Sequence, residues 1–127
     1  MNHDVEFQEI FDKIEEFLPV DWSKVIFYAE YGVNSYSMEF YAAKEGGEYI
    51  KCFALPGVNR VDLLKLFQEI NLLIKKKRDA AASGKLWSNM TMKVEHSGAF
   101  KVDYDYTDLL ENAYEYKNLW KEKYLIS

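Results

Sequence analysis

Two pairs of strand-like segments, each joined by a short turn, constrain the fold of this chain most. Residues 24–31 and 36–43 are rich in β-branched and aromatic side chains, and a Gly-Val-Asn-Ser stretch joins them. Residues 87–94 and 99–106 repeat the arrangement across Glu-His-Ser-Gly. Residues 36–43 and 99–106 alternate in polarity, which gives a strand one apolar and one polar face, and each pair of segments predicts an antiparallel hairpin.

Three further segments have the spacing of an amphipathic helix, at about 7–18, 60–82 and 108–124. Pro19 ends the first of them, because a proline disfavours the helical conformation of the residue before it. A third strand at 49–54 follows the first hairpin across a connection that contains two glycines. The order α-β-β-β-α-β-β-α predicts an α+β fold with a five-stranded antiparallel sheet packed with helices.

The second and third helices have recognisable ends. Asn59 can cap the second helix, with Asp62 three residues later as in a capping box, and Gly84 can end it. Thr107 or Asp108 can cap the third helix. We expect the second helix to be the main cover of the sheet, through a stripe formed by Leu63, Leu66, Phe67, Ile70, Leu73 and Ile74 and widened by Leu64 and Leu72. The face of the third helix comprises Leu110, Ala113, Tyr114, Lys117, Trp120 and Tyr124.

The composition predicts one folded domain, residues 1–127. Hydrophobic residues make up 49% of the chain and charged residues 29%, which supplies a core and argues against disorder. The single cysteine, Cys52, suits a reducing compartment and is expected to be a buried, unreactive strand residue. The N-terminus is acidic and amphipathic, and no apolar run reaches the length of a membrane span. We therefore expect a cytoplasmic protein with no membrane partner.

The net charge of −5 is unevenly distributed. Residues 1–50 contain 11 acidic and 3 basic residues, residues 51–102 contain 4 and 10, and residues 103–127 contain 6 and 3. Acidic ends would repel phosphate, so direct binding of nucleic acid is not expected and a basic protein partner fits better. The sequence leaves the oligomeric state open.

A basic run at 75–78, Lys-Lys-Lys-Arg, supports an alternative function. It lies at the end of the second predicted helix, where positive charge interacts favourably with the helix dipole. A nucleic-acid-binding or regulatory protein would use this run, although no second basic cluster or aromatic stacking platform adjoins it in the sequence. Binding that weakens steeply with salt would support this alternative.

Asp103 and Asp105 raise the question of a catalytic site. They are two residues apart on one predicted strand, so they share a face, with tyrosines beside them. This pattern fits a metal or acid–base site, a face that mimics a polyanion, or the wet side of a sheet. A metal-dependent hydrolase needs a third ligand, and His96 lies roughly 20 Å from Asp105 if the strand is extended. The wet side of a sheet is therefore favoured over catalysis, and a partner-binding face is intermediate.

Other motifs of catalysis are missing from the sequence. There is no glycine-rich phosphate loop, GxSxG, HExxH or CxxC motif, and neither histidine has a second one at ligand spacing. The sequence therefore predicts a binding domain rather than an enzyme, with no catalytic residue, metal or cofactor.

The aromatic content points to a binding surface. Ten tyrosines, eight phenylalanines and three tryptophans exceed what a core of this size needs. Tyr28 and Tyr41 fall opposite the apolar stripe, so we expect them to reach the surface, where tyrosine contributes binding energy and nearby carboxylates speed the capture of a basic partner. We predict one contact face, comprising Glu30, Glu39, Tyr41, Asp103 and Asp105. The acidic side of the first helix is an equal alternative.

Three motifs follow one another along the chain. Pro-x-x-Trp-x-Lys-Val at 19–25 leads into the first strand, and Trp-Ser at 87–88 starts the fourth. Gly-x-Phe-Lys-Val-x-Tyr-x-Tyr-Thr-Asp at 98–108 forms the fifth. In this order, over nearly the whole chain, the sequence resembles the YezG family of bacterial immunity proteins. The final helix keeps Tyr-x-Tyr-Lys at 114–117 but lacks the usual Gly-x-x-Pro finish of that family.

This resemblance implies a cytoplasmic antitoxin. Such proteins bind the toxic C-terminal domain of a cognate toxin, often a nuclease secreted by the type VII system, and protect the producing cell or its siblings. Protein binding, rather than catalysis, would then neutralise the toxin. The resemblance does not identify the contact residues, because the motif positions are mainly apolar and can simply specify the fold.

Overall fold

The chain divides into two compact units in a computed structural model. The helical unit comprises residues 1–20 and 53–86, and the sheet unit comprises residues 21–52 and 87–127. The structure describes the backbone of residues 5–32, 35–80, 87–107, 109 and 113–125, and the side chains of these residues except at 5, 6 and 77–80. The single domain expected from the sequence stays a prediction.

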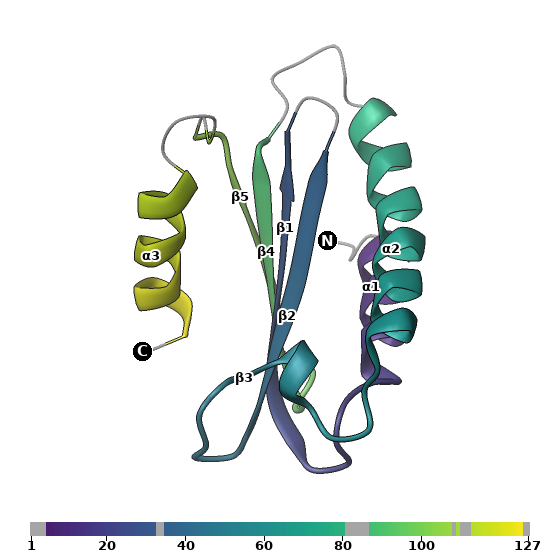
Figure 1. Ribbon diagram of the computed structural model, residues 1–127, viewed down its shortest axis with the longest axis vertical. Helices are drawn as coiled ribbons and strands as arrows, with labels where there is room; N and C mark the ends of the chain where they lie inside the picture. Colours follow the sequence, from purple (N-terminus) through teal and green to yellow (C-terminus); the bar gives the residue numbers. More distant parts are fainter. Residues whose placement is uncertain (1–4, 33–34, 81–86, 108, 110–112, 126–127) are drawn as a thin grey trace. The chain divides into compact units, whose positions relative to one another are not determined.

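Five antiparallel strands form the sheet unit, in the order β3-β2-β1-β4-β5 (Figure 1). Their bounds are β1 Trp22–Tyr31, β2 Tyr36–Lys44, β3 Ile50–Lys51, β4 Asn89–Glu95 and β5 Phe100–Asp105. The register places Tyr28 of β1 opposite Glu39 of β2 and Thr91 of β4, and Thr91 opposite Asp103 of β5. Because side chains alternate along each strand, these four residues share one face of the sheet.

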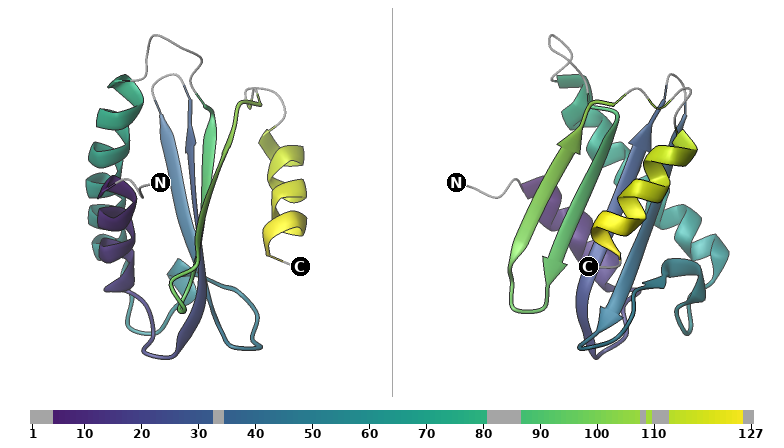
Figure 2. Two further views of the ribbon diagram at one scale, coloured as in Figure 1. Left: turned by 180° about the vertical axis from the view of Figure 1, so that it is seen from behind. Right: turned by 90° about the vertical axis from the view of Figure 1, so that its left-hand side faces the viewer.

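The helix α3, Ala113–Tyr124, lies against that face (Figures 1 and 2). Trp120 and Tyr124 of the helix form a buried cluster with Ile26 and Tyr28 of β1 and Tyr41 of β2. The Trp120 ring centroid is 4.8 Å from that of Tyr28 and 5.8 Å from that of Tyr41. Aromatic packing therefore fixes the position of α3 over the centre of the sheet.

Two helices, α1 Val5–Glu15 and α2 Arg60–Ala80, run side by side in the helical unit. The amine of Lys13 on α1 and a carboxylate oxygen of Glu69 on α2 are 3.1 Å apart. After Glu15, the N–H groups of Phe17 and Leu18 still donate to carbonyls three residues back, which tightens the chain before Pro19. The buried side chains are Phe7, Ile10 and Ile14 on α1, and Leu63, Leu66, Phe67, Ile70 and Ile74 on α2.

The sequence predicted the α+β class, the five antiparallel strands and the element order correctly. The third strand is shorter than expected: after Ile50 and Lys51 the chain enters a 3-10 turn, η1, at Cys52–Ala54. Cys52 is buried as predicted, but in this turn rather than in a strand. Pairing with β2 covers only two residue pairs, so the third strand contributes little to the sheet.

The stripe predicted for α2 is partly wrong. Leu64 is 54% exposed and Leu72 is 70% exposed, whereas most of the remaining stripe is buried. With 3.6 residues per turn, Leu64 is turned about 100° and Leu72 about 180° from the centre of the buried stripe. Whether α2 covers the sheet stays a prediction.

The predicted cap of α2 is confirmed. The N–H of Asp62 donates to Asn59 Oδ1 at 2.9 Å, and Asn59 Nδ2 donates to Asp62 Oδ2 at 2.8 Å. The return bond thus comes from the Asn59 side chain rather than from its backbone N–H. Thr107 does not cap α3, which begins six residues later, while Gly84, Asp108 and Leu110 lie outside the described residues.

Candidate functional site

The five predicted contact residues lie on the same face of the sheet. The β1–β2 register places Glu30, Glu39 and Tyr41 on the same face as Tyr28. The pairing of β1 with β4 and of β4 with β5 places Asp103 and Asp105 on that face too. This is the face that α3 covers (Figure 2). The five residues thus share a face and α3 lies over it, while their role as partner contacts stays a prediction.

The expectation that Tyr28 and Tyr41 reach the surface is wrong. Tyr28 is 1% exposed and Tyr41 5% exposed, and both rings pack against Trp120 of α3. Burial raises the pKa of both phenols, and hydrogen bonds to Glu30 and Glu39 respectively raise it further. Both phenols therefore act as neutral donors.

Glu39 is the most constrained carboxylate of this face. It is 8% exposed, and Lys117 Nζ of α3 donates to its Oε2 at 2.6 Å. The Tyr41 hydroxyl also donates to Oε2, and Lys51 Nζ lies 3.7 Å from Oε1. Burial alone would raise the pKa of Glu39, but Lys117, Tyr41 and Lys51 hold it below its ordinary value. Glu39 is therefore an ionised anchor for α3.

Glu30 and the two aspartates keep more exposure and also have partners within the sheet unit. The Tyr28 hydroxyl donates to Glu30 Oε1 at 2.7 Å, and the Tyr124 hydroxyl of α3 donates to Asp103 Oδ2 at 2.7 Å. Asp105 Oδ1 accepts the N–H of Thr107 at 2.8 Å and the Thr107 hydroxyl at 2.5 Å. Burial would raise the pKa of Asp105, but the bonds from Thr107 lower it overall.

Polar residues of β4 complete the face, and sequence reasoning missed them. Thr91 accepts the indole N–H of Trp120 at 2.8 Å, and Asn89 Oδ1 accepts the Tyr116 hydroxyl at 3.0 Å. Burial raises the pKa of Tyr116 to about 12. The available signal was the alternation of β4, in which Asn89, Thr91, Lys93 and Glu95 occupy every second position and so share one face. With Asn89 and Thr91 included, α3 makes polar contacts to β2, β4 and β5.

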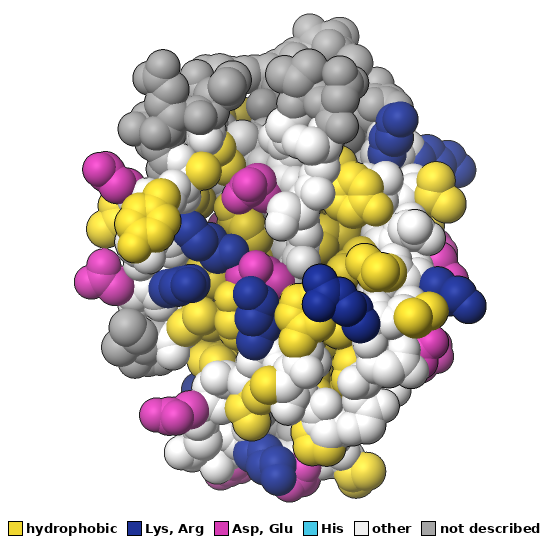
Figure 3. All heavy atoms as spheres, viewed as in Figure 1, with side chains coloured by type: hydrophobic (Ala, Val, Ile, Leu, Met, Phe, Trp, Pro, Cys, Tyr) yellow, Lys and Arg dark blue, Asp and Glu magenta, His cyan; other side chains and the backbone are white. Residues whose placement is uncertain are grey.

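The phase of α3 differs from the prediction. Lys117, Trp120 and Tyr124 face the sheet as expected, but Tyr114 is 80% exposed and Tyr116 faces the sheet in its place. Figure 3 shows charged side chains of both signs around hydrophobic ones on the side of the molecule where α3 lies. The useful signal was the four-residue spacing of Tyr116, Trp120 and Tyr124, which places all three on one helical face.

A small cavity of about 170 Å³ opens between α3 and the strands β4 and β5. The side chains that line it are mainly polar and aromatic, and they include Asn89, Thr91, Asp103, Asp105, Tyr116 and Tyr124. Several of these groups already bond one another across the cavity. The cavity is therefore part of the interface between α3 and the sheet.

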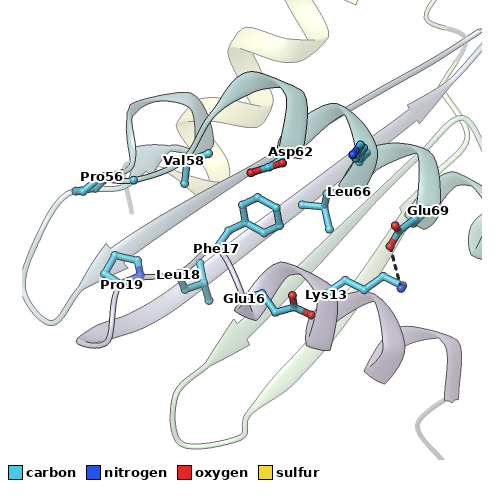
Figure 4. A pocket seen from close by; sticks show the side chains of 12 residues that line it. Lys13, Glu16, Phe17, Leu18, Pro19, Pro56, Val58, Asp62, Leu66 and Glu69 are labelled. Carbon is cyan, nitrogen blue, oxygen red and sulfur yellow. Dashed lines mark hydrogen bonds and ion pairs between the residues drawn. The ribbon is translucent and has the colours of Figure 1, made fainter.

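A larger hollow of about 550 Å³ lies in the helical unit, between the end of α1 and the start of α2 (Figure 4). Phe17 and Leu66 lie within it, and Glu16 and the Lys13–Glu69 ion pair lie along its side. The hollow is a candidate for contact with a partner.

The residues that the structure describes form no candidate metal centre. They contain no group of three or more His, Cys, Asp or Glu that could hold a metal ion. His96 instead packs on Trp22, with ring centroids 5.0 Å apart. Of the basic run at 75–78, Lys75 and Lys76 are exposed, and the side chains of the other two lie outside the described residues.

Comparison with protein-family profiles shows which family this chain belongs to. The family profile described as "Immunity protein YezG-like" matches residues 4–126. The chain belongs to the YezG-like immunity protein family. That match spans both units, and it includes the predicted contact residues and all of α3.

Two immunity proteins of the genus Bacillus are similar to this chain. Immunity protein YezG of Bacillus subtilis strain 168 is 29% identical over 128 residues, which cover 94% of this chain and 85% of the relative. Immunity protein YezG of Bacillus spizizenii strain ATCC 23059 is 27% identical over 133 residues, covering 94% and 80%. Family membership supports an immunity role with a toxin as partner. Within the described residues, every helix is too short or too polar to cross a bilayer.

Proposed function

We propose that this chain is a cytoplasmic antitoxin that neutralises a cognate toxin by binding it, without chemistry of its own. We further propose that the toxin is a basic nuclease exported by the type VII system. The observation that carries the proposal is the match of residues 4–126 to an immunity protein family. A net charge of −5 supports the choice of a basic partner.

Charge complementarity explains how such an antitoxin would work. A nuclease binds the phosphates of its substrate with basic side chains, and carboxylates at fixed positions can compete for the same groups. The exposed side of α1 offers Glu9, Asp12 and Glu15, and Glu16 follows directly after the helix. The bound antitoxin would occlude the active site or hold the toxin in an inactive conformation.

The burial of the predicted contact residues divides them into two groups. Glu30, Asp103 and Asp105 are partly exposed and remain proposed toxin contacts. Glu39 and Tyr41 are buried beneath α3, so they would act indirectly, by holding Lys117 and the helix in place. The side of the sheet unit between β5 and α3 and the acidic side of α1 are thus alternative toxin surfaces.

Protection of cells tests the function. The cognate toxin is expressed from an inducible promoter with and without the chain, and survival is measured. We expect survival only with the chain, together with a stable complex in size-exclusion chromatography. Killing that continues despite equal expression of a folded chain would contradict the proposal.

Charge reversal distinguishes the two surfaces. Asp103→Lys with Asp105→Lys changes the sheet unit, and Glu9→Lys with Glu16→Lys makes the same change in charge on α1 and the residue that follows it. We expect the first pair to weaken toxin binding at least tenfold if the sheet unit is the contact. Circular dichroism and thermal unfolding of each variant separate lost binding from lost folding. Unchanged affinity would remove that surface from consideration.

A further inference from the structure

The strand β5 forms one edge of the sheet. It pairs with β4, and no strand among the described residues pairs with its other side. Figure 2 shows it as the outermost strand, beside the strands that α3 crosses. β5 has six residues, whereas β3 at the opposite edge has two. An edge of this length can template the addition of another strand.

The backbone groups of β5 alternate between the two sides of the strand. The N–H of Glu95 donates to the carbonyl of Ala99 at 2.9 Å, in register with the pairing of β4 and β5. Hydrogen-bonded and non-bonded pairs alternate in an antiparallel ladder, so the odd-numbered residues of β5 direct their backbone groups toward β4. The even-numbered residues, centred on Val102, direct theirs outward.

The side chains of β5 are complementary to themselves about Val102. In an antiparallel pairing with Val102 opposite Val102 of a second copy, Phe100 faces Tyr104 and Lys101 faces Asp103, each of them twice. The two neighbouring registers with the same backbone match would place Lys101 opposite Lys101 or Asp103 opposite Asp103. Opposite charges and aromatic pairs stabilise cross-strand neighbours and like charges destabilise them, so one register is selected.

The charged groups needed for this pairing are accessible. The side chain of Lys101 is 71% exposed and that of Asp103 34% exposed. Lys101 Nζ lies 3.7 Å from Asp103 Oδ1 on the same strand, while Tyr124 occupies the other oxygen, Oδ2. In a dimer Lys101 would pair with Asp103 Oδ1 of the second copy instead of Asp103 Oδ1 of its own strand.

We propose that β5 is a self-association surface, on which a second copy of this chain adds antiparallel about Val102. The two five-stranded sheets then become one continuous sheet, with an isologous interface related by a two-fold axis. Strand pairing over so few residues buries less than the roughly 1,200 Å² of a stable interface, so the dimer is weak and depends on concentration. This property is separate from the binding of a toxin.

Sedimentation velocity tests the self-association, from about 10 μM to about 1 mM of the intact chain, a range suited to a weak interface. We expect a reversible monomer–dimer equilibrium that Lys101→Glu weakens at least tenfold. Lys93→Glu is the matched control, because Lys93 pairs with Lys101 across β4 and β5 but lies one strand away from the edge. A monomer at every concentration, or equal effects of both variants, would overturn the proposal.

A mixing experiment tests the register. Chains with Lys101→Glu carry two acids at the paired positions and chains with Asp103→Lys carry two bases, so each is expected to be monomeric alone. A mixture of the two is expected to form heterodimers, because every cross-strand pair becomes opposite in charge. Failure of two folded variants to associate would contradict the assigned register.

Val102→Pro provides a second test if Asp103→Lys does not fold. The N–H of Val102 points outward, so proline there spares the bonds to β4 and is tolerated at a sheet edge. We expect a folded monomer. A Val102→Pro chain that still dimerises would overturn the proposal. Amide hydrogen exchange of the native chain gives another outcome that would overturn it: protection of the β5 amides that appears only when the toxin is added, because the edge would then pair with the toxin.

Discussion

Glu39 carries a negative charge at a position that is 8% exposed, between a strand and a helix. Removing a carboxylate from water is costly, and the cost is offset only by partners with good geometry. Lys117 Nζ at 2.6 Å, the Tyr41 hydroxyl and the more distant Lys51 supply those partners. Lys117 also lies 4.3 Å from the ring centroid of Tyr28, so one lysine connects the charged and the aromatic contacts of α3.

Lys117→Met should therefore destabilise the fold. The substitution keeps the aliphatic stem but leaves Glu39 without its nearest cation, and we expect a loss of about 2 kcal/mol in the free energy of unfolding at pH 7. Lys121→Met on the exposed side of α3 should change it by less than about 0.5 kcal/mol. Urea unfolding measures both, and equal effects would refute the role of Lys117.

The same variant should respond to pH. The folded-state pKa of Glu39 lies below the value of 4.5 for an unperturbed side chain, so its charge stabilises the native protein above that pH. This contribution is lost as the pH falls through the lowered pKa. The stability difference between the native protein and Lys117→Met should therefore shrink between pH 7 and about pH 3.5. A difference that stays constant over this range would argue against an ionised Glu39.

At the scale of the elements, alternation and helical spacing specified the order and the class of the fold, and they left two things open. Period-two alternation placed Glu30, Glu39 and Asp103 on one face, but it does not say which helix covers that face. On α3, tyrosine occurs on both sides, and an amphipathic side chain suits either, so Tyr114 was assigned inward although Tyr116 is the inward residue. The alternation of β4 places Asn89 and Thr91 on the polar face of the strand, but it does not indicate that a helix bonds to them there.

The cap of α2 gives a prediction for this element. Asn59→Ala removes the oxygen that accepts the Asp62 N–H, and we expect a loss of about 1 kcal/mol. Asn59→Ser should restore most of it, because the serine hydroxyl can accept the same bond. Thermal unfolding of the three proteins tests the series. Equal stability of the alanine and serine variants would show that the cap contributes nothing.

The two sides of α2 should differ in their tolerance of change. Leu72→Gln replaces a side chain that is 70% exposed and should change stability by less than about 0.5 kcal/mol. Ile70→Ala leaves a void at a fully buried position and should cost about 3 kcal/mol. Urea midpoints of both variants measure the contrast. A large effect of Leu72→Gln would mean that this side of the helix is covered in solution.

On the scale of the whole molecule, net charge is the property that the sequence determines directly. The value of −5 includes exposed acids on α1 and partly exposed acids on the sheet unit. Long-range attraction between exposed charges is screened within about 8 Å at physiological salt, so the rate of encounter is its most sensitive measure. Apolar packing around aromatic residues does not depend on this screening by salt.

The rate of toxin binding should therefore depend on salt. If the toxin is basic, as proposed, its association rate constant should fall at least tenfold between about 20 mM and about 500 mM NaCl. The dissociation rate constant should change much less. Stopped-flow mixing measures both. An association rate that does not depend on salt would exclude electrostatic attraction as the basis of capture and would leave apolar contacts to explain the affinity.

Trp120 gives this antitoxin an optical reporter in its own sequence. Its indole N–H is held by Thr91, and its ring lies between phenol rings from two strands and from its own helix. A chain with Trp22→Phe and Trp87→Phe would emit from this indole alone. A red shift of its fluorescence on addition of toxin would mean that α3 lifts away from the sheet during capture, whereas unchanged emission would mean that the toxin binds the resting form.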